Sequence, residues 1–235
     1  MVNLVREAAN FGIELDRSRA EQFALYQSLL REWNQKINLT AIDDPDGIQI
    51  RHFLDSLTCA TVMGDLNGQR LIDVGTGAGF PGLPLKILYP DLRLTLVESV
   101  TKKTRFLEAV VQALNLENVQ IVDQRAETLG QQAEYRAQYD WATGRAVAAL
   151  RVLVEYLLPL CKIGGHMLAQ KGESARAEAE GAAPAIAKLG GGSPAFHPVQ
   201  LPGREETHYL VVIAKVAETP AEYPRRPGRP AKRPL

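Results

Sequence analysis

Apolar residues recur at helical spacing through the first quarter of the chain. From Asp16 to Ile37 they return every three or four positions, which predicts an amphipathic helix with Asp16 or Ser18 as its N-cap. A break at residues 44–47, Asp-Pro-Asp-Gly, precedes a second helical stretch that we expect from Asp46 to about Met63. We therefore expect residues 1–64 to form a helical cap.

Short apolar runs and helical patterns alternate after residue 64. Strands are predicted at 71–74, 94–98, 119–122, 140–145 and 165–172, and helices at 102–114 and 150–158. Such βαβ alternation is typical of a parallel sheet with helices packed on its faces. The segments 196–201 and 209–216 are predicted to be two further strands joined by a polar turn. We expect residues 65–217 to form this α/β core.

The remaining segments differ from the core in composition. Residues 173–189 are rich in alanine and charge, which predicts an exposed helix, and a flexible Gly-rich turn follows it. The last segment, residues 218–235, carries five basic residues among four prolines from Glu222 onward, which excludes a regular helix. It is either a disordered, solvated tail or a basic arm for RNA phosphates.

Composition limits the class of protein. With 235 residues, 46% hydrophobic and 23% charged, the chain has the make-up of one α/β domain with an appendage, or of two small domains. Its 27 basic and 27 acidic residues give a formal net charge of +0. No global field therefore attracts nucleic acid, and any RNA site must be a local patch.

Cysteine usage and hydropathy limit the compartment. Cys59 and Cys161 are the only cysteines, and their spacing indicates neither a zinc site nor a disulfide framework, so we expect no metal and a reducing cytoplasm. No run of about 18 apolar residues is present, as a membrane span would need. We expect a cytoplasmic protein that is neither exported nor embedded in a membrane.

The chemistry is concentrated in residues 71–82, Leu-Ile-Asp-Val-Gly-Thr-Gly-Ala-Gly-Phe-Pro-Gly. An apolar strand ends there in a glycine-rich turn, and Pro84 suits the first turn of a following helix. Gly75, Gly77 and Gly79 allow positive φ and the close approach of a ligand. A strand, a tight turn and a helix in this order are typical of a nucleotide pocket.

Two cofactors compete for this loop. Gly77, Gly79 and Gly82 also satisfy the dinucleotide fingerprint, although that match alone is weak. Asp73 favours S-adenosylmethionine, because a carboxylate before the loop repels a pyrophosphate and attracts the ammonium and sulfonium of the methyl donor. The remaining alternative, a glycine turn with no ligand, would weaken the local fold without packing anything.

Further candidate residues follow the predicted strands. Glu98 ends the second strand about 20 residues after the loop, where an acid accepts hydrogen bonds from ribose hydroxyls. Arg145 and Lys171 end the fourth and fifth strands on the same side of the sheet. An adenine edge could meet a backbone amide or an acid in residues 123–127, and the pattern leaves open which acid it would be.

The cap contains a polar segment whose ordinary interpretation is structural. Arg51 and Asp55 stand at positions i and i+4 of the predicted helix, which predicts a surface ion pair. His52 beside Arg51 is, taken alone, a surface histidine or a hydrogen-bonded core histidine.

Taken together, the motifs resemble the RsmG (glucose-inhibited division protein B) family nearly end to end. The resemblance is carried by Trp33-Asn34 with Asn38-Leu39-Thr40, by residues 51–56 (Arg-His-Phe-Leu-Asp-Ser), by residues 73–82 (Asp-Val-Gly-Thr-Gly-Ala-Gly-Phe-Pro-Gly), and by Arg145-Ala146 and Lys171-Gly172. The family consists of bacterial methyltransferases that modify N7 of a guanine in small-subunit (16S) ribosomal RNA.

The resemblance implies a class I S-adenosylmethionine-dependent methyltransferase, with a Rossmann-like seven-stranded sheet whose last strand is antiparallel. It implies S-adenosylhomocysteine as the product, small-subunit ribosomal RNA or the small subunit as the partner, and a monomer. Carried over by position, the donor contacts are Gly75, Phe80, Glu98, Ser99, Val100, Ala126, Glu127 and Arg145. Candidates for positioning RNA or guanine are Arg51, His52, Arg145 and Lys171. Gly144 stands where we expect serine or alanine, so a side chain has no hydrogen-bonding role there.

A guanine N7 acceptor implies a simple mechanism. N7 bears a lone pair and no proton, so it attacks the sulfonium methyl in line and needs no general base, and we assign no catalytic residue. Residues 143–145, Thr-Gly-Arg, lack the Asp/Asn-Pro-Pro-Tyr/Phe loop that exocyclic-amine methyltransferases carry. The alternatives are a small-molecule methyltransferase on the same fold and a non-catalytic RNA or ribosome-assembly module that retains the pocket.

Overall fold

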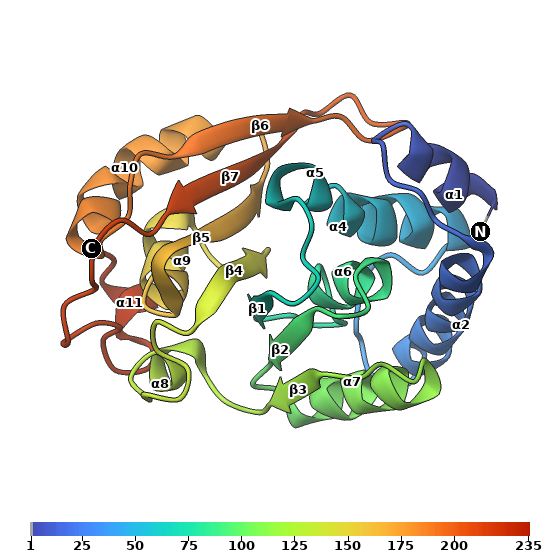
Figure 1. Ribbon diagram of the computed structural model, residues 1–235, viewed down its shortest axis with the longest axis horizontal. Helices are drawn as coiled ribbons and strands as arrows, with labels where there is room; N and C mark the ends of the chain where they lie inside the picture. The colour runs from blue at the N-terminus through green and yellow to red at the C-terminus, as the bar shows by residue number, and fades with distance from the viewer. Residues whose placement is uncertain (1) are drawn as a thin grey trace.

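A seven-stranded sheet of order β3-β2-β1-β4-β5-β7-β6 crosses the middle of the molecule in the computed structural model, which describes residues 2–235 (Figure 1). Its strands are β1 (Arg70–Val74), β2 (Arg93–Val97), β3 (Val119–Val122), β4 (Tyr139–Arg145), β5 (Cys161–Lys171), β6 (Ala195–Val199) and β7 (His208–Ala214). The first five pair in parallel, and β7 is antiparallel to β5 and β6. The predicted α/β class with a seven-stranded sheet and an antiparallel last strand is confirmed.

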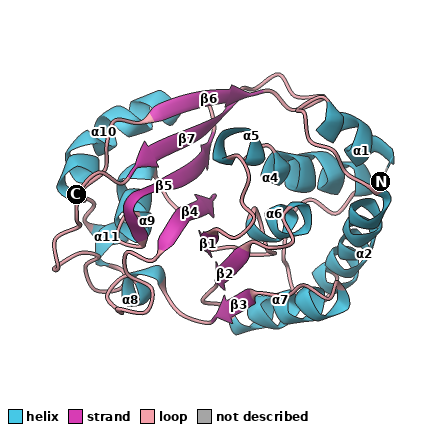
Figure 2. Ribbon diagram, viewed as in Figure 1, coloured by secondary structure: helices cyan, strands magenta, loops and turns pink. Residues whose placement is uncertain are grey.

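Helices cover both faces of the sheet (Figure 2). One face carries α6 (Gly82–Leu88), α7 (Thr101–Ala113) and the cap elements α1 (Val2–Ala9), α2 (Arg17–Asn34), α3 (Pro45–Gly47), η1 (Ile48–Leu54), α4 (Asp55–Leu57) and α5 (Ala60–Met63). The other carries α8 (Ala126–Leu129), α9 (Leu150–Leu157), α10 (Ala175–Lys188) and α11 (Arg229–Lys232). Neighbouring strand residues such as Leu71 and Ile72 accordingly pack into two different cores, one on each side.

The cap and the sheet share one hydrophobic core. Phe23 and Tyr26 of α2 pack on Phe53 of η1, with ring centroids 5.0 and 5.1 Å apart. Tyr26 also stacks on Phe80 of the glycine loop at 5.6 Å, and its hydroxyl donates to the carbonyl of Ala78. The cap therefore holds the glycine loop from one side.

The two predicted cap helices differ from the structure in their ends and their winding. α2 ends at Asn34 rather than Ile37, because the Asn34 Oδ1 accepts from the backbone of Leu39 and Thr40 and turns the chain. The second stretch is π-helical over residues 48–54, and the Asp55 N–H donates to the Ile50 carbonyl. This wider turn takes Asp55 into the interior, where its ion pair is with Arg145, so the predicted Arg51–Asp55 surface pair is wrong.

Two C-terminal predictions also need correction. The helix predicted in residues 173–189 is present as α10, but it is not exposed on all sides, because an alanine face with Ala179, Ala182 and Ala185 is buried in the core that it shares with α9. Alanine carries no side chain beyond Cβ, so the two helices can approach closely. The tail is neither disordered nor wholly without helix: α11 forms one turn, and the Arg136 guanidinium donates to the carbonyls of Tyr223 and Thr219 at 2.6 and 2.7 Å.

Among residues 2–235, every helix is too short or too polar to span a lipid bilayer.

Candidate active site

The glycine loop between β1 and α6 needs glycine for two separate reasons. Gly75 and Gly79 have φ values of 66° and 96°, where other residues are strained. A Cβ on Gly75 would lie 2.8 Å from Val147 Cγ2, and one on Gly79 would lie 2.6 Å from the Tyr26 hydroxyl. The loop is therefore packed against β4's exit on one side and the cap on the other.

Asp73 is fully buried at the base of this loop. Its Oδ2 accepts hydrogen bonds from Thr76 Oγ1 at 2.6 Å and from the Gly82 amide at 2.9 Å, which closes the loop onto α6. Burial raises the pKa of the carboxyl to about 6, although these two hydrogen bonds oppose the shift. Its Oδ1 has no hydrogen-bond partner among the described residues, and such a buried acceptor is costly unless a ligand satisfies it.

Glu98 follows β2 and is held in place by backbone amides. Its Oε1 accepts from Ser99 and Val100 at 2.8 and 3.0 Å, and its Oε2 accepts from Gly77 at 3.1 Å. The carboxylate is buried and joins the glycine loop to the end of β2. Oε2 retains capacity for a further hydrogen bond, because a carboxylate accepts about four, two at each oxygen, and Oε1 already accepts two.

A pocket of about 300 Å³ opens at the carboxyl ends of β1 to β4. This volume is at the small end of the range for small-molecule sites, and the position is the usual one in an α/β sheet. Its lining includes the predicted donor contacts Gly75, Glu98, Ser99, Ala126 and Glu127. The other lining residues are Val74, Val97, Gln124, Arg125, Val147, Ala148, Tyr156 and Ala231.

The acids that follow β3 have other partners. Asp123 accepts a hydrogen bond from Thr101 Oγ1 at 2.9 Å and does not line the pocket. Glu127 lines the pocket, and its Oε1 accepts from the Gly228 amide of the tail at 2.8 Å. Of the two, only Glu127 is in the pocket wall, where it also binds a segment far along the chain.

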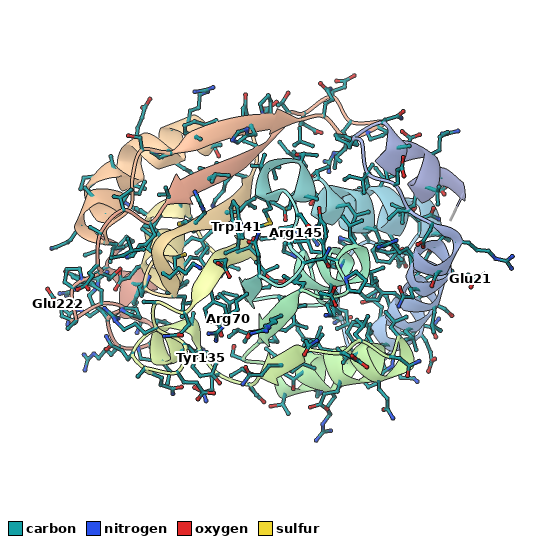
Figure 3. All side chains as sticks on the ribbon, viewed as in Figure 1. Glu21, Arg70, Tyr135, Trp141, Arg145 and Glu222 are labelled. Atoms are coloured by element: carbon teal, nitrogen blue, oxygen red, sulfur yellow. The ribbon has the colours of Figure 1, made fainter. Side chains whose placement is uncertain are left out.

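Arg145, at the end of β4, turns away from this pocket toward the cap and lies near the centre of the molecule (Figure 3). Its Nη1 contacts Asp55 Oδ2 at 2.8 Å, and its guanidinium lies 4.9 Å from the centre of the Phe80 ring. Gln170 of β5 donates to the same Asp55 oxygen at 3.0 Å. Although burial opposes it, His208, whose Nδ1 lies 3.7 Å from Asp55 Oδ1, and the charge of Arg145 hold the pKa of Asp55 below its ordinary value.

His52 is buried in the same junction between cap and sheet. Its ring stacks on Phe80 at 4.7 Å, and its Nε2 lies 2.7 Å from Thr40 Oγ1. Burial, followed by the charge of Arg145, lowers the pKa of His52 to about 4. The imidazole is therefore neutral at pH 7.

The remaining predicted residues are more widely distributed. Lys171 donates to the Ala148 carbonyl at 2.7 Å and pairs with Glu178 at 2.9 Å, so it braces α9 against α10. Arg51 is exposed on η1. Gly77, Gly79, Phe80 and Val100 are not part of the pocket lining, and the Phe80 ring faces the cap. Residues 2–235 hold no group of three or more His, Cys, Asp or Glu side chains arranged to bind a metal ion.

Sequence reasoning missed two parts of this region. Tyr156 and Ala231 line the pocket from α9 and from the tail, and neither stands in a motif or at a strand end. The helical spacing predicts Asp55 at the surface, although it is the acid to which Arg145 and Gln170 both bind. Asp55 stands within residues 51–56, one of the segments that carry the resemblance. That position is the sequence signal that could have identified Asp55 as a site residue.

Comparison with known sequences identifies close relatives. Residues 19–205 match the family model described as rRNA small subunit methyltransferase G (GidB). The chain is 54% identical over 235 residues to Ribosomal RNA small subunit methyltransferase G of Roseiflexus castenholzii, with all of both chains covered. It is 46% identical over 224 residues to the protein of the same name from Alkaliphilus metalliredigens, covering 95% of this chain and 94% of the relative.

Comparison with solved structures supports the fold. A point mutant of the 16S rRNA (adenine(1408)-N(1))-methyltransferase from Catenulisporales acidiphilia, crystallised with its cosubstrate SAM, superposes with a TM-score of 0.52 at 19% identity. The superposition covers 68% of this chain and 90% of that one. At this identity the likeness establishes a shared architecture.

Proposed function

Because the chain belongs to the rRNA small subunit methyltransferase G family, it is an S-adenosylmethionine-dependent methyltransferase of small-subunit ribosomal RNA, and we propose that it methylates N7 of a guanine. The family assignment disfavours the small-molecule alternative and the non-catalytic module. The assignments of the acceptor atom and of individual residue roles are based on the chemistry of the site.

The residues of the pocket suit the methyl donor. Asp73 is not itself part of the pocket lining, but it directly precedes Val74 and Gly75, which are. Its buried Oδ1, which has no hydrogen-bond partner among the described residues, is an acceptor of the kind that a positively charged group of the donor would satisfy. The Oε2 of Glu98 retains acceptor capacity for a ribose hydroxyl, and Ala126 and Glu127 stand where an adenine ring would be flanked. S-adenosylmethionine supplies a methyl group on a positively charged sulfur, which an electron pair can attack directly.

The observation that carries the N7 assignment is the state of the ionisable groups at the cap–sheet junction. His52 is neutral, has a pKa of about 4 and contacts Thr40, and Asp55 is paired with Arg145. The other imidazole beside Asp55 is that of His208, whose Nδ1 lies 3.7 Å from Asp55 Oδ1. A site of this kind suits an acceptor nitrogen that has no proton to lose, and guanine N7 is such an atom.

The chain then acts by holding and orienting its ligands. Asp73 and Glu98 fix the donor at the strand ends, and Tyr26 and Phe80 hold the glycine loop in the shape that the pocket requires. Arg145 holds the cap segment that carries His52 and Asp55 against the sheet. Catalysis under this proposal comes from alignment of N7 with the methyl group.

The proposal is tested by supplying labelled methyl donor with small ribosomal subunits, with naked small-subunit RNA or with a metabolite pool. We expect label in RNA, released by chemical cleavage specific for 7-methylguanine. Label in RNA at a position resistant to that cleavage would contradict the N7 assignment, and label confined to small molecules would contradict the RNA substrate.

A further inference from the structure

The C-terminal segment is anchored to α9 by a buried ion pair. The backbone N–H and the guanidinium of Arg225 make three hydrogen bonds to the Glu155 carboxylate, at 2.8, 2.9 and 2.6 Å. Glu155 is fully buried, and Pro224 and Pro230 are also buried. We call residues 224–233 the tail wall, because this anchoring docks them against α9.

The inner side of the tail wall belongs to the donor pocket. Gly228 donates its amide to Glu127, and Ala231 lines the pocket together with Glu98 and Tyr156. Figure 1 shows α11, coloured red near the end of the chain, beside α8 and α9. The inner face of the tail wall therefore contacts residues that surround the donor pocket.

The outer side of the tail wall carries free positive charge. Arg226, Arg229, Lys232 and Arg233 are exposed and, with Pro227 and Gly228, line a hollow of about 580 Å³. In the part of the chain that the structure describes, Arg225 is the one cation of this segment that forms an ion pair. Residues 224–235 contain no Asp or Glu, so these charges stand out in a chain whose net charge is +0.

We propose that this hollow binds a backbone phosphate of the RNA substrate. The inference rests on the proposed function, since it assigns a contact to the same RNA. Arginine presents several N–H donors in a fork that matches phosphate oxygens, and three arginines here converge with a lysine on one concave surface. An RNA that is methylated at the donor pocket must bring some of its backbone phosphates close to that pocket.

The two faces of the tail wall also predict coupling between RNA and the methyl donor. Phosphate bound outside and donor bound inside both favour the docked position of the same ten residues. By linkage, RNA should then raise donor affinity by the same factor by which donor raises RNA affinity.

The test replaces the four outer cations and leaves the anchor intact. The variant R226Q/R229Q/K232Q/R233Q keeps Arg225, and the control R17Q/R31Q/K36Q/K162Q removes four exposed cations elsewhere, so both lose the same charge. RNA affinity is measured at several salt concentrations with full-length protein. We expect the slope of log K against log salt to fall by about 0.7 for each phosphate that the tail variant no longer binds, and to change less in the control.

A second measurement distinguishes a specific contact between RNA and the tail wall from a general effect of positive charge. Donor affinity is measured with and without RNA, and the rise caused by RNA in the wild type should be absent from the tail variant and retained in the control. Equal salt slopes in the wild type and the tail variant would overturn the proposal, as would equal losses in the two variants. Inorganic phosphate that reproduces the rise at low concentration would identify a free-phosphate site instead of an RNA contact.

The outcomes also distinguish this inference from the proposed function. If the wild type fails to methylate RNA, the proposed function fails, whatever the tail variant binds. If the wild type methylates RNA and the tail variant binds and couples as the wild type does, the tail inference alone fails. Matching circular dichroism spectra and unfolding midpoints would show that the compared variants are folded.

Discussion

At the scale of single residues, the site depends on how burial sets the charge of Asp73 and His52. Burial acts in opposite directions on the two, raising the pKa of the carboxyl to about 6 and lowering that of the imidazole to about 4. Neither value follows from the sequence, because both depend on neighbours such as Arg145 that are distant along the chain. The sequence nevertheless identified Asp73 and His52 as candidate site residues, because each stands within a recognised motif.

Asp73→Asn should weaken donor binding by about 1.5 to 3 kcal/mol at pH 8, the usual size of a charge-assisted hydrogen bond. The donor's positive charge favours the ionised carboxylate, so its pKa is lower in the complex than in the free protein. Wild-type affinity should therefore be full above pH 6 and fall as the pH drops below 6, by up to about tenfold per unit. Calorimetric titration across pH measures both effects.

The matched control for this prediction is Asp123→Asn, which removes an exposed carboxylate outside the pocket. It should bind donor as the wild type does. The assignment of Asp73 to the donor fails if a folded Asp73→Asn protein has the wild-type dissociation constant, or if it retains the wild-type pH dependence.

His52→Gln should retain most of the single-turnover rate when donor and RNA are saturating. The wild-type rate should be flat between about pH 6.5 and 9, because guanine N7 has no proton to lose. A base with a pKa of about 4 would also give a flat profile in that range, so the substitution is the decisive measurement. A loss of about 10² or more in rate would indicate general-base catalysis and contradict the N7 mechanism.

At the scale of helices and strands, the pattern predicted the elements that follow a single periodicity and missed those shaped by tertiary contacts. The short apolar run that contains Leu71 and Ile72 and the helical period of α2 are local signals, and both predicted elements are present. The π-helical turn at residues 48–54 has no such signal, because its wider hydrogen bonds are stabilised by packing of His52 and Asp55. Alanine suits both a buried and an exposed face, so α10 could not be placed from composition.

Arg225→Ala should lower the free energy of unfolding by about 3 to 5 kcal/mol, because it leaves the Glu155 carboxylate buried without its cation. Arg226→Ala, one position along and exposed, should change stability by less than about 0.5 kcal/mol. Urea unfolding of the two variants measures the difference. Equal stabilities would show that the tail is not anchored by this pair.

Deleting residues 224–235 should lower donor affinity as well as RNA affinity. The deletion removes Ala231 from the pocket lining and leaves Glu127 without the Gly228 amide. From the sequence alone, a solvated tail would be removable without any effect on the donor. Donor titration of the truncated protein, checked for folding by circular dichroism, decides between a solvated tail and a tail wall that forms part of the donor pocket. Unchanged donor affinity would contradict the tail wall.

At the scale of the whole molecule, the cap and the sheet unite segments that the sequence separates. Residues 3–64 have no core of their own in the structure, because their apolar side chains pack with those of β1, α6 and α7 in one cluster. The cap contributes Tyr26 to the glycine loop and Asp55 to Arg145, so the site is complete only when both parts are present.

The two tryptophans report on the two parts. Trp33 lies in α2 of the cap and Trp141 lies in β4 of the sheet, and Figure 3 marks the latter near the centre. Trp33→Phe and Trp141→Phe each leave one fluorescent reporter. We expect both proteins, after correction for any change in stability, to unfold in a single transition that coincides with the loss of circular dichroism. A cap reporter that unfolds before the sheet would indicate an independent domain.

The wall that Ala231 adds to the donor pocket has a consequence for selective inhibition. Class I methyltransferases share the strand-end pocket, so compounds that mimic the donor tend to inhibit many of them. A methyltransferase whose chain ends with the last strand has no counterpart of Ala231 or Gly228. An adenosine analogue extended toward Ala231 should therefore discriminate this protein from such enzymes by contacts that they do not have.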